Sequence, residues 1–213
     1  EAELLFKRAL AIREKAHGPE HPDVALSLNN LATLYDIQSR YSEVEPLHKR
    51  SLAIREKAFG PEHPDVAMSL GNLAGFYETQ GRYYEAEPLY KRSLTIREKV
   101  FGPEHPDVAL SLCSLASLYV TQGHYAEAEL LYRRSLAVRE KVFGPEHHDV
   151  SMSLNNLGVL YQNQGRYAEA EPLYKRSLRI DEKVFGPEHT EVAASLNNLA
   201  LLYDKQGRYA EAE

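Results

Sequence analysis

The sequence predicts an all-α protein built as a solenoid of antiparallel helix pairs. The run Gly-Pro-Glu-His returns five times, and successive copies stand 42 residues apart. A fixed period of this size marks a stack of similar units, each of which contacts its neighbours. Within one period the apolar residues recur every three or four positions, which is the spacing of an amphipathic helix. No alternating strand pattern occurs, so each unit is expected to be a helical hairpin.

The first helix of a unit is predicted over residues 22–38. Val24, Leu28 and Tyr35 fall on one helical face, and Pro22 suits the first turn, where its missing N–H costs nothing. The turn that follows has the sequence Gln-Gly-Arg/His-Tyr in the later units. Its glycine is expected to take the left-handed backbone conformation that commonly ends a helix. Ser39 takes the glycine's place in the first unit, where the same geometry would cost about 1 kcal/mol.

The second helix is predicted over residues 42–58. Ser42-Glu43-Val44-Glu45 resembles a capping box at its start. Pro46 falls in the first turn, which tolerates proline, and Gly60 followed by Pro61 ends the helix.

We expect one solenoid domain over residues 1–213. Residues 1–21 match a lone second helix with its loop. Four full repeats follow at 22–63, 64–105, 106–147 and 148–189, and residues 190–213 supply a first helix and a truncated second one. Because the chain starts at Glu1 and stops within the pattern, we expect it to be a fragment of a longer protein.

Composition narrows the classes of partner. The net charge is -6, from 25 Lys and Arg against 31 Asp and Glu, which argues against nucleic-acid binding because such surfaces are normally basic. The apolar runs are too short to span a membrane, so no membrane partner is expected. Cys113 is the only cysteine, which excludes an intrachain disulfide and favours a reducing compartment and a cytoplasmic location.

The repeat resembles a known family. Leu28, Leu31, Ala32 and Tyr35 match the large, leucine, small and tyrosine positions of the tetratricopeptide repeat. The 42-residue version, with Asn-Asn-Leu-Ala, Gln-Gly-Arg-Tyr and an acidic-Pro loop, is similar to the kinesin light chain repeats. The resemblance implies a right-handed superhelix whose concave groove binds an extended peptide or a partner helix. It also implies a role as a cargo adaptor.

Pairs of asparagines recur in the middle of the first helix, although asparagine is a middling helix former. The resemblance implies that this helix lines the groove and that the second amide of each pair hydrogen-bonds the backbone of a bound peptide. The alternative is that the amides only bridge neighbouring helices. The pairs, of which the second unit keeps only one member, are Asn29 and Asn30, Asn72, Asn155 and Asn156, and Asn197 and Asn198.

The residue types at other positions of the same helix face vary between units. Such variation is expected of a surface that selects its ligand, although solvent exposure alone also permits it. Leu26, Met68, Leu110 and Met152 lie on this face one turn before the amides. The variable candidate residues for the groove are Thr33, Ser117, Asp36, Glu78 and Gln162.

The sequence does not favour an enzyme, a metal site or a cofactor. His21 and its counterparts come singly, one per unit, whereas zinc needs several converging ligands. These histidines are expected to cap the following helix or to pack under the loop. His48 and Cys113 occur once each, and Cys113 has no evident activating partner.

The alternative function is structural, with the chain as a self-assembling solenoid that stacks head-to-tail. The first and last helices lack partners, so one molecule's end could receive the next molecule's start. In this hypothesis the apolar residues of the last full helix would be covered by those of the first helix. The two sets are Val192, Leu196, Leu199 and Tyr203, and Leu5, Leu10 and Ile12.

Overall fold

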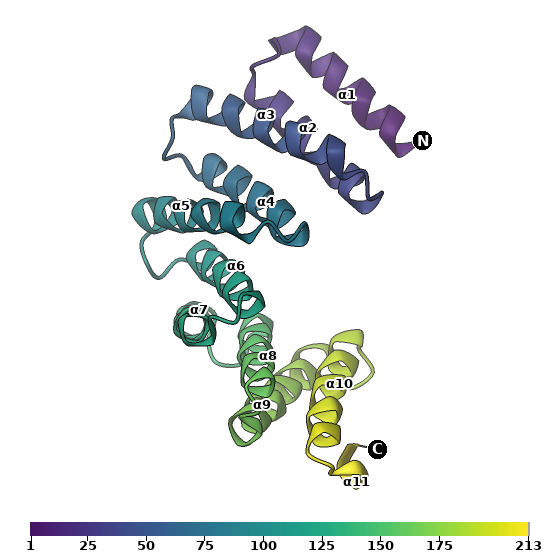
Figure 1. Ribbon diagram of the computed structural model, residues 1–213, viewed down its shortest axis with the longest axis vertical. Coiled ribbons are helices and arrows are strands. Elements are labelled where there is room, and N and C mark those ends of the chain that lie inside the picture. Colours follow the sequence, from purple (N-terminus) through teal and green to yellow (C-terminus); the bar gives the residue numbers. More distant parts are fainter. Residues whose placement is uncertain (213) are drawn as a thin grey trace. The chain divides into compact units, whose positions relative to one another are not determined.

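The computed structural model describes residues 1–212, and this part of the chain folds into helices joined by short loops (Figure 1). The prediction of an all-α fold is confirmed, because residues 1–212 contain no strand. We call the even-numbered helices from α2 to α10 "helices A" and the odd-numbered ones from α1 to α9 "helices B". In chain order the helices are α1 Ala2–His17, α2 Pro22–Ile37, α3 Tyr41–Phe59, α4 Pro64–Thr79, α5 Tyr83–Phe101, α6 Pro106–Thr121, α7 Tyr125–Phe143, α8 His148–Asn163, α9 Tyr167–Phe185, α10 Thr190–Lys205 and α11 Tyr209–Ala212.

The helices form two compact units, the first at Glu1–Pro103 and the second from Glu104 onward. In the first unit α1 to α5 pack in sequence, each helix against the next along the chain. In the second unit α6 to α10 do the same, and α8 also contacts α10. Each unit is therefore a short stack of antiparallel helix pairs. No described helix has the length and apolar character required to cross a bilayer.

The cores repeat with the sequence period. In the first unit Val24, Ala25 and Leu28 of α2 pack against Ile54 of α3. The same positions, 42 residues later, pack together between α4 and α5. Burying an aliphatic side chain of this size contributes roughly 1.5–3 kcal/mol. In the second unit a larger cluster includes the buried Tyr174.

A histidine begins each helix A. The Nδ1 atom of His21 accepts a hydrogen bond from the backbone N–H of Asp23 at 3.2 Å, which satisfies one of the unpaired donors of the first turn. Its counterpart His63 does the same, and its ring stacks on Phe59 with the ring centroids 4.5 Å apart. The expected capping role of these histidines is confirmed.

The helix B start differs from the prediction. α3 begins at Tyr41, and the residue before it, Arg40, makes no side-chain cap. The predicted capping box at Ser42 is therefore wrong, because Ser42 already lies inside the helix. The left-handed turn residue is confirmed, with φ of 59° at Ser39 and 70° at Gly81.

Candidate partner-binding surface

The solvent-facing side of α2, α4, α6 and α8 exposes a large apolar side chain at one repeated position. Leu26 is 45% exposed and Met68 38% in the first unit, and Leu110 is 50% and Met152 44% exposed in the second. Their neighbours toward the core, such as Ala25 and Ala67, are fully buried, so these four side chains are the large apolar groups that this part of each helix presents to solvent. In each unit we call the surface that carries these side chains, with the positions four and seven residues later, the helix A face of that unit.

The helix A face carries little charge. α2, α4, α6 and α8 contain no Lys or Arg. Apart from the aspartate in the first turn, their carboxylates are Asp36 in α2 and Glu78 in α4, both half-buried. The cations of the chain lie mainly on helices B and in the turns.

The two asparagines of a pair have different surroundings. Asn29 is buried, and its Oδ1 atom lies 3.2 Å from Nδ1 of His48 on α3. Asn155 reaches across to α10, where its Nδ2 donates to Ser195 Oγ at 3.4 Å and its Oδ1 accepts from Asn198 at 3.5 Å. The first member of these two pairs thus bridges helices.

The second member of a pair is the one that faces outward in the first unit, where Asn30 and Asn72 are exposed. Asn156 is half-buried in the second unit. On α10, Asn197 is exposed and borders an open cavity of about 370 Å³ with Leu201 and its neighbours.

The remaining predicted groove residues also lie on these helices. Thr33 is exposed, and its hydroxyl donates to the carbonyl of Asn29 at 3.0 Å. Ser117 is exposed as well. Glu78 accepts a hydrogen bond from the Tyr90 hydroxyl at 2.8 Å. In the second unit Gln162 accepts the same bond from Tyr174 at 3.2 Å, so glutamine can replace glutamate at this position.

A repeated contact that the sequence analysis did not predict ties α1, α3, α7 and α9 to the helix pair that follows each of them. Arg82, in the turn after α4, binds Glu45 of α3 at 2.6 Å, and its guanidinium lies 4.2 Å from the centre of the Tyr77 ring. Tyr77 also donates to Glu45 at 3.0 Å. We call each such trio a clamp. The other clamps are Glu3, Tyr35 and Arg40, then Glu129, Tyr161 and Arg166, and Glu171, Tyr203 and Arg208.

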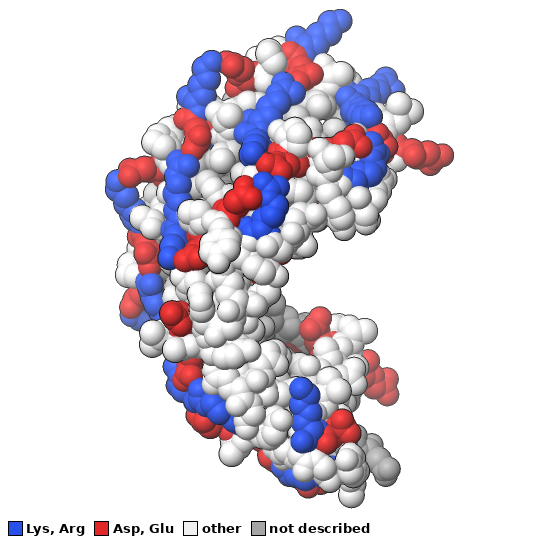
Figure 2. Space-filling model, viewed as in Figure 1, with Lys and Arg blue, Asp and Glu red and all other residues white. Residues whose placement is uncertain are grey.

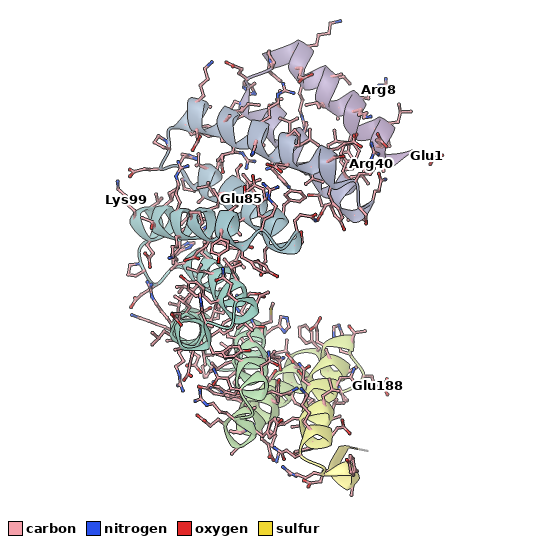
Figure 3. The ribbon with its side chains drawn as sticks, in the orientation of Figure 1. Glu1, Arg8, Arg40, Glu85, Lys99 and Glu188 are labelled. Carbon is pink, nitrogen blue, oxygen red and sulfur yellow. The ribbon has the colours of Figure 1, made fainter. Side chains whose placement is uncertain are left out.

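Cations and carboxylates neutralise one another in the clamps. Hydrogen bonds from Arg82 and Lys49 lower the pKa of Glu45 to about 2, because they favour the ionised form. Arg82 also binds Glu85. Figure 3 shows Arg40, which fills the same role in the first clamp, beside the start of α1. In the face shown in Figure 2, Lys and Arg side chains lie next to Asp and Glu side chains over α3 and α5.

The clamp arginine in the turn after α8 or α10 also donates to the side-chain amide of a half-buried glutamine. Arg166 donates to Oε1 of Gln164 at 2.8 Å. After α6 the arginine is replaced by His124, and Oε1 of Gln122 is the buried side-chain oxygen without a partner within residues 1–212. The substitution of one residue thus leaves an acceptor unsatisfied.

A buried polar network distinguishes the last repeat. In α3, Arg55 donates to Ser69 Oγ of α4 at 2.7 Å. Its counterpart in α9 is Asp181, which is 1% exposed and accepts from Ser151 and Ser195 at 2.7 Å each. His148 Nδ1 lies 3.2 Å from the other carboxylate oxygen of Asp181.

This network contains the residue types of a serine hydrolase but not their arrangement. A catalytic serine must donate to the imidazole that removes its proton. Here Ser151 donates to the carboxylate of Asp181, so the imidazole of His148 does not activate it. The network instead joins α8, α9 and α10.

The remaining candidates for a reactive or metal-binding site in the described part of the chain are Cys113 and clusters of metal-ligating side chains. Cys113 Sγ lies 3.0 Å from Ser135 Oγ. Within residues 1–212 no three or more His, Cys, Asp or Glu side chains converge as a metal site would require.

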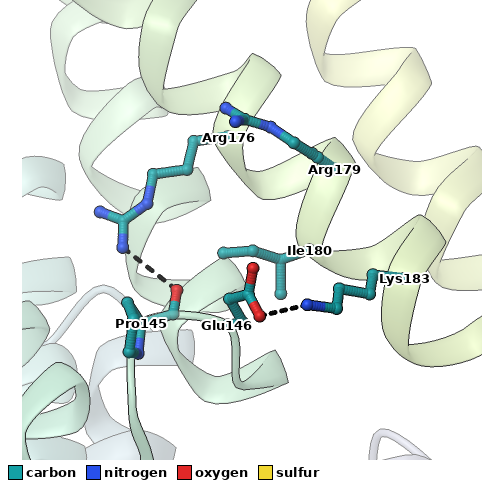
Figure 4. Close-up of a pocket in the computed structure, with 6 residues that line it drawn as sticks. All are labelled: Pro145, Glu146, Arg176, Arg179, Ile180 and Lys183. Carbon is teal, nitrogen blue, oxygen red and sulfur yellow. Dashed lines mark hydrogen bonds and ion pairs between the residues drawn. The ribbon is translucent and has the colours of Figure 1, made fainter.

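A cavity of about 310 Å³ lies between the loop before α8 and helix α9 (Figure 4). Three cations surround it, but two of them are already engaged. Arg176 donates to the carbonyl of Pro145 at 3.1 Å and binds Glu140 at 2.6 Å, and Lys183 binds Glu146. Arg179 is the remaining cation, so the cavity is a structural ion-pair site with one additional positive charge.

Comparison with solved structures supports the same architecture. The chain is similar to BtubC (BKLC) from P. vanneervenii, with a TM-score of 0.83 and 21% identity over 99% of this chain and 85% of that one. It is also similar to a kinesin light chain-like protein of P. anserina with nearly identical TPR-like repeats. That match has a TM-score of 0.77 and 31% identity, and covers 90% of this chain and 91% of the other.

No curated protein sequence matches the chain. The family model for the tetratricopeptide repeat matches residues 1–57, 65–141, 131–183 and 149–213. Proteins with this repeat are generally scaffolds that bind other proteins. Together with the helix pairs, these matches show that the chain belongs to the tetratricopeptide repeat family, in its kinesin light chain-like, 42-residue form.

Proposed function

We propose that the helix A face binds an extended peptide or a helix of a partner protein. The observation that carries this proposal is the repeated exposure of Leu26, Met68, Leu110 and Met152 on helices without any Lys or Arg. Within each unit, two neighbouring helices A therefore offer an apolar contact at equivalent positions to a ligand that lies across them. Exposed apolar surface of this kind marks interaction sites.

The asparagine amides would supply direction and register. An amide group offers both a donor and an acceptor, so it matches the backbone of an extended peptide. Asn30 and Asn72 are exposed at equivalent positions of α2 and α4, next to Leu26 and Met68. We therefore assign the peptide contacts in the first unit to Asn30 and Asn72, and the bridging role to Asn29 and Asn155.

Paired substitutions test this division of roles. Affinity for a fluorescein-labelled leucine-rich peptide, followed by anisotropy, should fall about thirtyfold in the Asn30→Ala/Asn72→Ala variant, because each of the two lost hydrogen bonds costs about 1 kcal/mol. Its unfolding midpoint should stay unchanged. Asn155→Ala should lower the unfolding midpoint without changing the affinity. Unchanged affinity in the first variant would contradict the proposal.

Among binding scaffolds, we propose the cargo-adaptor role because of the likeness to the kinesin light chain-like protein of P. anserina. An adaptor must hold two different partners at once. Immobilised chain carrying a saturating peptide on the helix A face should still retain a second protein, which a mass-spectrometric comparison of loaded and empty chain would detect. Loss of every retained protein on peptide loading would argue for a single binding surface.

Self-association is the second candidate function, and two exposed apolar positions favour it. Ile12 of α1 is 58% exposed, whereas its counterpart Ile54 is 5% exposed. Leu196 of α10 is 47% exposed, whereas its counterpart Leu28 is fully buried. Within residues 1–212 no helix covers Ile12 as α2 and α4 cover Ile54, and only the short α11 follows α10, so α1 of one molecule could cover α10 of another.

Some of the residues that the sequence suggested for the head-to-tail contact are buried within the chain. Val192 and Tyr203 are already buried within the chain, and Leu10 packs against the core of α2. Leu199 is partly buried against the core of the second unit, so Ile12, Leu5 and Leu196 remain as the candidate contacts. Sedimentation velocity over a concentration series should show oligomers that the Ile12→Glu substitution abolishes. A monomer at every concentration would exclude self-association of this polypeptide.

A further inference from the structure

We infer that the cavity between the loop before α8 and helix α9 binds an acidic side chain of a partner protein, through the guanidinium of Arg179. The cavity belongs to the second unit, and its lining comes from the loop and from α9. The helix A face contributes none of these residues, so this site is independent of the peptide surface proposed above.

Six residues surround the cavity, which has a volume of about 310 Å³. This volume is at the small end of ligand sites, which enclose about 300–1,000 Å³, so the cavity suits a single side chain. The residues of α9 lie three, four and seven positions after the first of them, which places all four on one helix face. The six residues are Pro145 and Glu146 of the loop, and Arg176, Arg179, Ile180 and Lys183 of α9.

Cations outnumber carboxylates around the cavity. Lys183 binds Glu146, and Arg176 binds Glu140 at 2.6 Å. Arg179 is exposed and takes part in no ion pair with another residue of the described chain, 1–212. One positive charge therefore remains unbalanced beside the cavity.

The counterpart site in the first unit has the same ion pairs but lacks the additional cation. Arg92 binds Glu56 at 2.7 Å, and Lys99 binds Glu62. Thr95 takes the place of the unpaired arginine. The first-unit site is therefore balanced, and a difference at one position gives the second-unit site its positive charge.

The charge of Arg179 acts on the loop side of the cavity. The hydrogen bond and the charge of Lys183 lower the pKa of Glu146, and the positive charge of Arg179 lowers it further, because a nearby cation favours the ionised carboxylate. In Figure 4, Arg176 and Arg179 lie above the pair of Glu146 and Lys183. An acidic group that enters beside the two arginines would meet Arg179 without displacing Glu146 from Lys183.

The chemistry of the cavity selects the class of ligand. A guanidinium favours a carboxylate or a phosphate, because its paired N–H donors match two oxygens of either group. The net charge of -6 disfavours a polyanion such as a nucleic acid, whereas proteins with this repeat generally bind other proteins. The buried Ile180 offers an apolar contact to the methylene groups of the entering side chain. The ligand is therefore a glutamate, an aspartate or a phosphorylated side chain of a protein.

Three short peptides without apolar side chains test the inference. Each has glycine and serine residues around one central residue, which is glutamate, phosphoserine or glutamine, and its ends are acetylated and amidated. Binding is followed by the backbone amide signals of Glu146 and Ile180 in NMR titrations. The glutamate and phosphoserine peptides should shift both signals saturably, and the glutamine peptide should shift neither. Tighter binding of the phosphoserine peptide would assign the site to a phosphorylated partner, and equal or tighter binding of the glutamate peptide would assign it to a carboxylate.

Arg179→Ala should weaken the binding of both acidic peptides about fivefold, which is the upper limit for an exposed ion pair. This variant should fold normally, because Ala137 stands at the counterpart position of α7. The matched control Lys205→Ala removes one exposed positive charge from α10 of the same unit and should leave the affinity unchanged. Thr95→Arg adds the cation to the first unit, where the acidic peptides should then shift the amide signal of Glu62.

Equal affinity of Arg179→Ala and the unmodified chain, or equal shifts by the acidic and the glutamine peptides, would overturn the inference. An equal loss of affinity in Arg179→Ala and Lys205→Ala would also overturn it, since attraction by net charge alone would explain that result. Because these peptides lack apolar side chains, none of these results bears on the helix A face, whose affinity for the leucine-rich peptide is measured separately.

Discussion

Gly158 in α8 lies where a methyl group has no room. A Cβ atom added there would sit 2.6 Å from Cε1 and 2.9 Å from Cδ1 and Cζ of the Tyr174 ring, whereas carbon atoms in contact lie about 3.5–4.0 Å apart. Tyr174 is 1% exposed, and its hydroxyl donates to Gln162, so the ring cannot move away freely. Overpacking of this kind costs about 1–3 kcal/mol.

Gly71 in α4 is the matched control, because it too lies inside a helix A. A Cβ atom there would meet only Ser93 Oγ, at 3.9 Å, and other units carry larger side chains at this position, such as Asn29. Replacing a glycine by alanine inside a helix stabilises it by about 1 kcal/mol, and this gain applies equally to both variants. We therefore expect Gly71→Ala to stabilise the protein.

The difference between the two variants isolates the packing cost. In urea unfolding followed by circular dichroism, Gly158→Ala should be less stable than Gly71→Ala by about 1–3 kcal/mol. Equal stabilisation by both substitutions would refute the reasoning, since it would mean that Tyr174 yields without cost.

Two further predictions concern single histidines. His124→Arg should raise the free energy of unfolding by about 1 kcal/mol, because a guanidinium there can donate to Oε1 of Gln122 as Arg166 does for Gln164. The thermal midpoint should rise accordingly, and a lower midpoint would contradict this prediction. Burial lowers the pKa of His48 below its ordinary value of 6.5, so the unfolded chain binds this proton first and stability falls as the pH drops through about 6.5. His48→Tyr should show a flatter dependence of urea midpoint on pH, and an unaltered slope would exclude His48 as a source of acid sensitivity.

Periodicity made the helices predictable, because the features that define them lie close together in the chain. Pro22 marks a helix start, and the glycines such as Gly81 mark a helix end, by local backbone preference alone; Ser39 is placed only by its register with these glycines. The ion pairs of the clamps were not predicted, because residues such as Arg40 and Glu3 are 37 positions apart. The spacing within one helix does not indicate a contact over that distance. Their recurrence with the 42-residue period was a signal that could have indicated them.

The sequence alone does not predict which asparagine of a pair is exposed to solvent. Asn29 and Asn30 are adjacent and chemically identical, yet one is buried against His48 and the other is exposed. Which amide faces outward depends on the packing of the neighbouring helix B and of the next helix A. Asp181 was missed for a similar reason, since its hydroxyl partners come from two other helices.

The chain contains two methionines, and both lie on the helix A face, with Met68 in the first unit and Met152 in the second. A protein labelled with ¹³C at the methionine methyl groups therefore gives one NMR signal from each unit at the proposed binding surface. Addition of the leucine-rich peptide should shift the Met68 signal, the Met152 signal, or both, according to the unit that it binds. Saturable binding that leaves both methyl signals unmoved would place the partner elsewhere and contradict the assignment of the helix A face.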